Sequence, residues 1–243
     1  MGARRFFVAD AHEIGDGLVI DGGDAHKIVN VLRLHDGDEI EIADSAARIF
    51  RASIQLDERS VRATLRELVT KQPIAPSITI DVAQGIPKGA KMDFIVEKLS
   101  ELGVASIVPL ESERTIVRDL GGNKLERWRR LAKTAAAQSG RADVATIAEP
   151  VRLETLFARF ATYDAVLFPW ELAQAPPLRE ALPPLIADAR RILVIVGPEG
   201  GFSHAEAEMA MQAGAHVVSL GSQILRTETA ALVLLSVLRY LMQ

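Results

Sequence analysis

Residues 1–70 show short stretches in which apolar and polar positions alternate, a pattern typical of half-buried strands. The clearest example is Asp38–Ile42, where polar and apolar side chains alternate from Glu39 onward. The same reasoning predicts strands at residues 4–8, 48–56 and 61–69, with a turn at 57–60. These stretches indicate a β-rich N-terminal region.

One helix is expected to interrupt these strands. Asp24 can cap it, and Ile28, Val31 and Leu32 follow at helical spacing. Several short strands combined with a single helix predict a small β-barrel.

Residues 71–77 read Lys-Gln-Pro-Ile-Ala-Pro-Ser, and the two prolines disfavour both a helix and a central strand. We therefore predict a linker here, with one domain at residues 1–72 and a second at 73–243.

Beyond the linker, the pattern changes to alternating strands and helices. Strands are expected at 78–83, 105–110, 165–168, 192–196 and 216–220, and helices at 91–102, 124–139, 206–213 and 227–241. The proline pairs at 176–177 and 183–184 are expected to break up the region between two of these strands. This alternation predicts an α/β domain with a mostly parallel sheet.

Composition narrows the class of protein. The chain has 243 residues, of which 49% are hydrophobic and 25% charged, so it can bury a sizeable core. It contains no cysteine, which excludes disulfides, thiolate metal sites and a cysteine nucleophile. The five histidines have no metal-binding spacing, so no metal is expected. No apolar run approaches the roughly 20 residues of a membrane span, and we expect a cytoplasmic protein.

Charge gives a mixed indication of partners. The net charge of −4 argues mildly against nucleic acid as a partner. Residues 118–141, however, contain seven basic and two acidic residues, a local excess of five positive charges. That segment can contact phosphates, although a solvated helix face is the more common explanation for a charge run.

A glycine-rich loop follows the expected strand at 192–196. It reads Val196-Gly-Pro-Glu-Gly-Gly-Phe-Ser203, and Ser203 with Glu206 forms a capping box for the next helix. Glycines permit close approach of another group, and ligands of open α/β sheets bind at the carboxyl ends of strands. An ordinary turn is the alternative, but three glycines and a proline favour a ligand-binding loop.

A second loop, Leu220–Ala230, also joins a strand to a helix, which Thr227 or a neighbour can cap. Ile224 and Leu225 are apolar residues within a loop and are expected to cover a chain segment or a flat aromatic ligand. Arg226 lies beside a helix N-terminus, which favours anions, so it is expected to have a partner. Structural pairing with Glu199 or Glu228 is the alternative.

The sequence does not match other common nucleotide-binding and hydrolase motifs. There is no early G-x-G-x-x-G, and residues 85–91 have the wrong spacing for a phosphate loop. No G-x-S-x-G elbow is present.

Six motifs together resemble the ribosomal RNA small subunit methyltransferase E family, within the SPOUT class of knotted methyltransferases. They are Lys88–Asp93, Glu101–Val104, Ser112–Arg114, Gln138–Arg141, Gly197–Ser203 and Ile224–Ala230. The resemblance covers nearly the whole chain, and its specificity comes from the six motifs occurring in this order.

The resemblance implies a PUA-like RNA-binding barrel followed by a SPOUT domain with a C-terminal trefoil knot. It implies S-adenosylmethionine as cofactor and a homodimer with each active site near the subunit interface. The implied reaction is methylation of N3 of one uridine of 16S rRNA, position 1498 in the customary numbering, within the assembled small ribosomal subunit.

This reading assigns residues to three roles. Arg226 is the candidate for stabilising the uridine anion, and Glu199 and Glu228 are candidates for accepting its proton. The expected cofactor-binding residues are Gly197, Pro198, Gly200, Leu220, Gly221, Ile224, Leu225 and Thr229. The expected RNA-binding residues are Arg4, Arg5, His26, Arg33, Lys88, Lys91, Arg114, Arg130 and Arg141.

Three features depart from the family pattern: Ala25 before His26, the alanines at 135–137, and Gln223 before the Ile-Leu-Arg motif. Alternative functions are a SPOUT methyltransferase for another rRNA or tRNA position, a non-catalytic RNA-binding ribosome-assembly protein, and a nucleotide-dependent metabolic enzyme.

Overall fold

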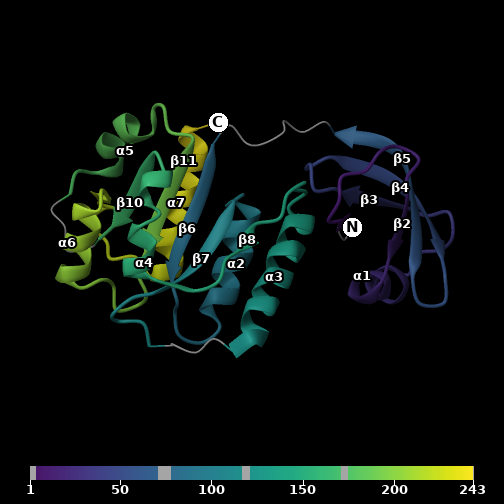
Figure 1. The fold of residues 1–243 in the computed structure, drawn as a ribbon, viewed down its shortest axis with the longest axis horizontal. Helices are drawn as coiled ribbons and strands as arrows, with labels where there is room; N and C mark the ends of the chain where they lie inside the picture. The colour runs from purple at the N-terminus through teal and green to yellow at the C-terminus, as the bar shows by residue number, and fades with distance from the viewer. Residues whose placement is uncertain (1–3, 71–77, 117–120, 171–174, 243) are drawn as a thin grey trace. The chain divides into compact units, whose positions relative to one another are not determined.

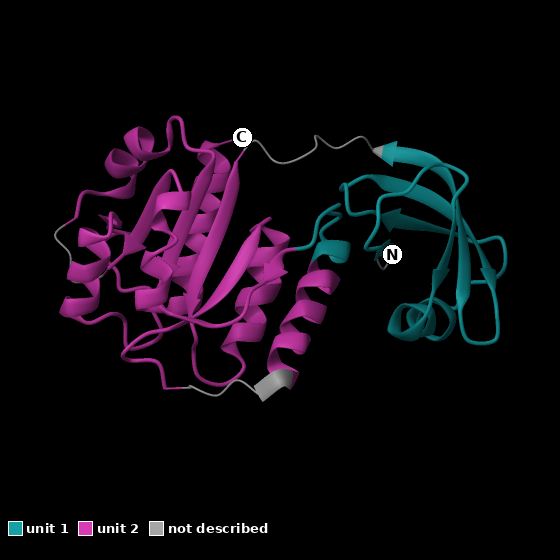
Figure 2. Ribbon diagram, viewed as in Figure 1, with its two compact units in different colours: residues 1–75, 136–144 teal, residues 76–135, 145–243 magenta. Residues whose placement is uncertain are grey.

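The computed structural model describes residues 4–70, 78–116, 121–170 and 175–242. The chain divides into two compact units (Figure 2): unit 1 comprises residues 1–75 and 136–144, and unit 2 comprises 76–135 and 145–243. The linker expected at 71–77, and with it the boundary between residues 72 and 73, lies outside the described residues. The assignment of 136–144 to unit 1 has no counterpart in the sequence-based division.

Unit 1 contains a five-stranded sheet in the order β1-β3-β4-β5-β2 (Figure 1). Its strands are β1 (Arg5–Phe7), β2 (Gly17–Ile20), β3 (Glu39–Ala43), β4 (Ile49–Leu56) and β5 (Val61–Thr70). β1 pairs with β3 in parallel and the other pairs are antiparallel. Four of these strands were predicted. The short β2 was missed because four residues beginning with a glycine give little periodicity.

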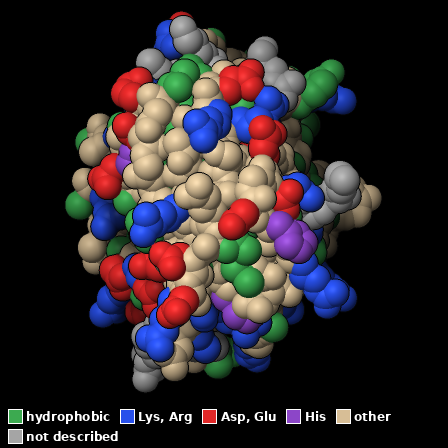
Figure 3. Space-filling view, turned by 90° about the vertical axis from the view of Figure 1, so that its right-hand side faces the viewer, with side chains coloured by type: hydrophobic (Ala, Val, Ile, Leu, Met, Phe, Trp, Pro, Cys, Tyr) green, Lys and Arg blue, Asp and Glu red, His purple; other side chains and the backbone are tan. Residues whose placement is uncertain are grey.

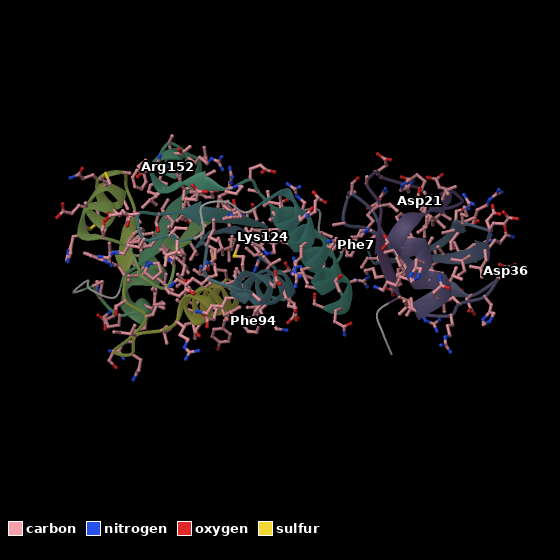
Figure 4. All side chains as sticks on the ribbon, turned by 90° about the horizontal axis from the view of Figure 1, so that it is seen from below. Phe7, Asp21, Asp36, Phe94, Lys124 and Arg152 are labelled. Carbon is pink, nitrogen blue, oxygen red and sulfur yellow. The ribbon has the colours of Figure 1, made fainter. Side chains whose placement is uncertain are left out.

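The helix of unit 1 is α1 (Gly22–His26), which continues into the π-helical turn η1 (Lys27–Val31). Its N-cap is Asp21, labelled in Figure 4, and Asp24 lies in the first turn, so the expected cap was wrong by three positions. Ile28 is fully buried against the core of the sheet, where Phe6, Ile42 and Phe50 also lie.

Unit 2 contains a seven-stranded sheet in the order β12-β10-β11-β6-β7-β8, with β9 also pairing with β7. Every pair in it is parallel, as the alternating pattern predicted. The strands are β6 (Thr79–Gly85), β7 (Ser106–Glu111), β8 (Thr146–Ile147), β9 (Val151–Arg152), β10 (Ala165–Pro169), β11 (Arg191–Val196) and β12 (His216–Val218). The first strand of the unit, β6, is central and pairs with β11, so the strand order reverses there.

The main helices of unit 2 are α2 (Lys91–Glu101), α3 (Gly121–Gln138), α5 (Leu178–Ile186), α6 (His204–Gln212) and α7 (Thr227–Leu241), with the shorter α4 (Leu153–Phe157) and η2 (Phe160–Thr162) between them. α7 packs against β6, β11 and α2. Its apolar face, including Leu234, Leu235 and Leu238, is buried, as expected for a core helix. Within the described residues, no helix is long and apolar enough to cross a membrane.

α5 was not predicted, because its interior contains Pro183 and Pro184. Leu182 and Ile186 of this helix are buried. Their burial outweighs the backbone hydrogen bonds that the two prolines cannot donate.

Candidate functional site

A pocket of about 400 Å³ lies at the carboxyl ends of β10, β11 and β12. Its wall is formed by the ends of these strands, the loops that follow β11 and β12, and the start of α2. The lining residues are Lys91, Pro169, Trp170, Val196–Glu199, Gly201, Phe202, Ser219–Thr227 and Ala230. This is the edge of the sheet where open α/β folds bind ligands.

Most of the expected cofactor-binding residues line this pocket: Gly197, Pro198, Leu220, Gly221, Ile224 and Leu225. Gly200 and Thr229 are not among its lining residues. Gly200 lies against Arg114 instead. A Cβ added at Gly200 would meet the Arg114 side chain at 3.2 Å, and the guanidinium donates a hydrogen bond of 2.7 Å to the Gly200 carbonyl.

The glycine-rich loop owes its shape to tight packing and to a well-capped helix. The capping box between Ser203 and Glu206 is present as predicted. Phe202 is buried, and its ring lies 4.5 Å from that of Phe168 on β10. A Cβ added at Gly197 would lie 3.1 Å from the Phe202 ring, so this position favours glycine.

The second loop brings both an exposed apolar residue and an exposed cation to the pocket. Ile224 lines the pocket with 84% of its surface exposed. Arg226 is the N-cap of α7 and is exposed. Within the described part of the chain it forms no salt bridge, so the structure does not contain the pairing with Glu199 or Glu228 that was the alternative. Thr227, the other candidate cap, is buried as the first helical residue.

Glu199 is held by the first residue of α2 and by the segment just before that helix. Its Oε1 lies 2.7 Å from Lys91 Nζ, and the carboxylate also accepts a hydrogen bond from the Lys88 backbone N–H at 3.1 Å. Partial burial opposes ionisation, but these donors outweigh it and lower the pKa of Glu199 below its usual value. The Lys91 ammonium and the Lys88 N–H therefore stabilise the ionised form of the Glu199 carboxylate.

Glu228 lies in the first turn of α7 and is not among the lining residues. Its Oε2 is buried and has no hydrogen-bond partner in the described residues.

The expected RNA-binding residues divide into two groups. Arg5 pairs with Glu41, Arg141 with Asp143, and Lys91 with Glu199, while Arg114 donates to a backbone carbonyl. By contrast, five side chains form no salt bridge with the described residues: Arg4, His26, Arg33, Lys88 and Arg130. On the face drawn in Figure 3, basic side chains are interspersed with acidic ones.

Sequence reasoning missed two residues at this site, Trp170 and Gln84. Trp170 lines the pocket and is 9% exposed, and its Nε1 is buried without a partner in the described residues. The only sequence signal was its position two residues after the strand expected at 165–168. Gln84 is fully buried on β6 behind the pocket. Within the described residues, no group of three or more possible metal ligands is present.

Comparisons with known proteins identify the family of this chain. A family model described as an RNA methyltransferase domain matches residues 75–239. The ribosomal RNA small subunit methyltransferase E of Bacillus subtilis is 31% identical over 91% of this chain and 89% of its own length. The enzyme of the same name from Synechocystis is 32% identical over 99% of this chain and 78% of its own.

Among solved structures, the ribosomal RNA small subunit methyltransferase E of Neisseria gonorrhoeae, bound to S-adenosyl methionine, aligns with a TM-score of 0.86 and 28% identity. The alignment covers 98% of this chain and 97% of that one. The similarity therefore extends over both units. The chain belongs to the ribosomal RNA small subunit methyltransferase E family.

Proposed function

We propose that this protein is an S-adenosylmethionine-dependent methyltransferase that methylates N3 of one uridine of 16S rRNA in the assembled small ribosomal subunit. The observation that carries the proposal is the pocket at the carboxyl ends of β10–β12, in whose wall Arg226 has no acidic partner among the described residues. The names of the curated relatives and the S-adenosyl methionine bound to the Neisseria structure support it.

The pocket suits the cofactor in size and chemistry. Its volume of about 400 Å³ lies within the usual range for small-molecule sites. Ile224, Leu225 and Pro198 provide apolar surface for the adenine, and glycine backbone groups in both loops are available for polar contacts. When bound, S-adenosylmethionine supplies an electrophilic methyl group.

Arg226 is suited to stabilising the substrate. A uridine N3 is a poor nucleophile until its imide proton leaves, and negative charge then spreads onto the flanking carbonyl oxygens. A cation already positioned near such an oxygen lowers the barrier, above all where water is excluded. No acidic side chain of the part of the chain that the structure describes neutralises Arg226, and the positive end of the α7 dipole lies beside it.

The two carboxylates fit the role of proton acceptor less well. The lowered pKa of Glu199 makes it a weak base, because proton acceptors work best when their pKa lies near the working pH. Glu228 does not line the pocket. We propose that Glu199 instead holds the glycine-rich loop against α2.

We further propose that unit 2 is a SPOUT domain with a trefoil knot formed by the two cofactor loops, and that unit 1 is a PUA-like RNA-binding domain, with the boundary near residue 72. The return of the chain from the edge strand β12 to the central strands β6 and β11 through α7 supports the first part. The curled sheet of unit 1 supports the second (Figure 1), as do Arg4 and Arg33, which form no salt bridge with the residues that the structure describes.

We also propose a cytoplasmic homodimer. Phe94 on α2 and Tyr240 and Leu241 on α7 are 45%, 79% and 48% exposed. α2 and α7 pack together, and Phe94 is labelled on the same side of unit 2 as α7 in Figure 4. Exposed apolar groups on neighbouring helices are typical of a surface that a second subunit covers.

The proposal is tested by incubating the protein with labelled S-adenosylmethionine and small ribosomal subunits that lack the modification, then locating the methyl group by mass spectrometry of RNA fragments. We expect one methyl group on N3 of a single uridine. A methyl group elsewhere in rRNA or tRNA would keep the enzyme class and replace the substrate. RNA binding without methyl transfer, from folded protein that binds the cofactor, would indicate a non-catalytic assembly protein.

A further inference from the structure

Gln84 lies at the carboxyl end of β6, between the two loops that line the pocket. It is fully buried, although its side chain is polar. Its Nε2 donates one hydrogen bond of 2.8 Å to Thr227 Oγ1 and another of 3.0 Å to its neighbour's carbonyl, Gly85 O. A strand residue is thereby connected to the N-terminus of α7, which is distant in the sequence.

The hydrogen bonds continue from Thr227 to the other loop. The Thr227 hydroxyl donates its single proton to the carbonyl oxygen of Gly197, so it must accept from Gln84. The three groups form one directed chain from the Gln84 amide through the Thr227 hydroxyl to the Gly197 carbonyl. This chain joins the first residue of α7 to the first glycine of the glycine-rich loop.

Backbone packing next to Gln84 strengthens the same junction. A Cβ added at Gly85 would lie 2.3 Å from Pro198 N, so the β6 backbone and the glycine-rich loop are in direct contact. The end of β6 therefore contacts both walls of the pocket, the glycine-rich loop through Gly85 and α7 through Gln84.

Fold stability alone does not account for an amide at this position. Gln84 Oε1 is buried without a hydrogen-bond partner in the described residues, and an unpaired buried acceptor is destabilising. An apolar side chain of similar volume would avoid that cost. An apolar side chain could not, however, donate to the Thr227 hydroxyl and so direct its proton to Gly197.

We infer that Gln84 is a positioning residue for the cofactor: acting through Thr227, it sets the separation between the glycine-rich loop and the start of α7, where Arg226 lies. This inference rests on the proposed function. It predicts that the polarity of the Gln84 side chain, as well as its volume, determines cofactor affinity.

The test measures the Kd of S-adenosylhomocysteine by calorimetry and the melting temperature of the full chain for Gln84→Leu, Gln84→Glu and Thr227→Val. Gln84→Leu keeps an apolar core and removes the donor. Gln84→Glu keeps the size, and once ionised its carboxylate accepts the Thr227 proton and so withdraws it from Gly197. Because burial raises the pKa of a carboxyl group, this variant is assayed at about pH 9. For both Gln84 variants we expect Kd to rise about tenfold, the change that corresponds to one typical net hydrogen bond, with the melting temperature of Gln84→Leu not lowered.

Val82→Ala is the matched control, because Val82 is a fully buried residue of the same strand that does not line the pocket. We expect it to lower the melting temperature while Kd changes less than twofold. A Kd change in Val82→Ala as large as that in Gln84→Leu would show that affinity follows fold stability and would overturn the inference.

A double mutant tests whether Gln84 acts through Thr227 or whether the two residues affect binding independently. If Gln84 acts through Thr227, adding Gln84→Leu to Thr227→Val should weaken binding little further, whereas fully additive losses would overturn the inference. Failure of the proposed function is distinguishable, since the wild-type protein itself would then not bind S-adenosylhomocysteine. Wild-type binding together with an unchanged Kd in both Gln84 variants would overturn only the positioning role.

Discussion

Lys91 Nζ lies 2.7 Å from Glu199 Oε1, and this ion pair joins the first residue of α2 to the glycine-rich loop. The sequence-based reading gave these residues different roles, RNA contact for Lys91 and proton transfer for Glu199. In this ion pair each charge neutralises the other. Both residues line the pocket and form part of its wall.

The first prediction concerns Glu199→Gln. The amide still accepts the Lys88 N–H hydrogen bond but loses the ion pair, so we expect cofactor affinity to weaken a few-fold and kcat to keep at least a tenth of its wild-type value. A general base would contribute about 10²–10⁴ to the rate. The measurement is kcat at saturating cofactor and RNA. A loss of a hundredfold or more would assign proton transfer to Glu199 after all.

The pH dependence of this ion pair has a definite sign. Because the pKa of Glu199 is lowered in the folded protein, its stabilising contribution is present above the ordinary value of 4.5 and is lost as the pH falls through the folded pKa. Cofactor affinity of the wild type should therefore not change through this group between neutral and mildly acidic pH.

The second prediction concerns Gly85→Ala. The added Cβ would lie 2.3 Å from Pro198 N and 2.6 Å from Gly197 C, so backbone has to move in one of two packed segments. We expect a loss of stability of about 1–3 kcal/mol, the usual cost of overpacking, and a large loss of affinity for S-adenosylhomocysteine. The measurements are urea denaturation and calorimetry.

Gly23→Ala is the control for that substitution. Gly23 lies in α1, its φ is not positive, and a Cβ there would meet nothing within 4 Å. Because alanine favours helix, we expect unchanged or slightly higher stability. Equal losses in both variants would contradict the role of close packing at Gly85.

The third prediction uses the two tryptophans of the chain. Trp128 is buried on α3 and its Nε1 donates a 3.0 Å hydrogen bond to Asp93, whereas Trp170 lines the pocket with its Nε1 unpartnered in the described residues. Trp128→Phe should keep a fluorescence change on titration with S-adenosylhomocysteine, and Trp170→Phe should lose it. A signal that disappears with Trp128 would place the cofactor away from the pocket.

Sequence patterns predicted five strands and four helices of unit 2, but they missed β8, β9, α4, η2 and α5, which are very short or, in α5, contain prolines. The two loops at the pocket were also recognisable, because glycines, a capping box and an isolated arginine are local signals. Neither the prediction of these elements nor the recognition of the two loops depends on knowing which strands are neighbours.

The residues that were missed depend on contacts between distant parts of the chain. Gln84 directly follows the strand expected at 78–83 and has no local sign of function, and its importance arises only where β6 meets both loops. Arg5 and Arg141 look like free cations in the sequence, but Arg5 contacts Glu41 and the carbonyl of Arg141, while Arg141 contacts Asp143. Partners of this kind follow from strand order and register, which hydrophobic patterning does not specify.

The fourth prediction concerns a buried carboxylate at the start of β6. Asp81 is 7% exposed and accepts a 2.8 Å hydrogen bond from the Tyr163 hydroxyl. Burial raises the pKa of Asp81 despite the Tyr163 hydrogen bond and the nearby Arg191, and burial with the Asp81 contact raises the pKa of Tyr163 to about 12. The fold therefore disfavours the ionised form of Asp81.

A carboxyl group with a raised folded-state pKa stabilises most below its ordinary pKa and loses that contribution as the pH rises through the folded value. Asp81→Asn keeps an acceptor for Tyr163 without a charge, so we expect it to stabilise the protein at pH 8 by about 1 kcal/mol, a typical single-substitution effect. The advantage should vanish near pH 4. Denaturation at both pH values checks this, and a variant that is less stable at pH 8 would contradict it.

The last prediction concerns Arg226, whose side chain lies at the pocket without an acidic partner in the described residues. If Arg226 stabilises the uridine anion, it acts in the transition state and contributes little to binding the cofactor. Arg226→Ala should then lower kcat about 10²–10³-fold, as loss of an oxyanion-stabilising donor does, with the Kd for S-adenosylhomocysteine within about threefold of wild type. Arg226→Lys should recover part of the rate, because it keeps the charge and loses the planar array of donors. Single-turnover methyl transfer to small subunits, measured beside calorimetry of cofactor binding, separates the two effects. Parallel losses of rate and affinity in a folded variant would instead make Arg226 a cofactor-binding residue and leave the uridine anion to be stabilised by another group.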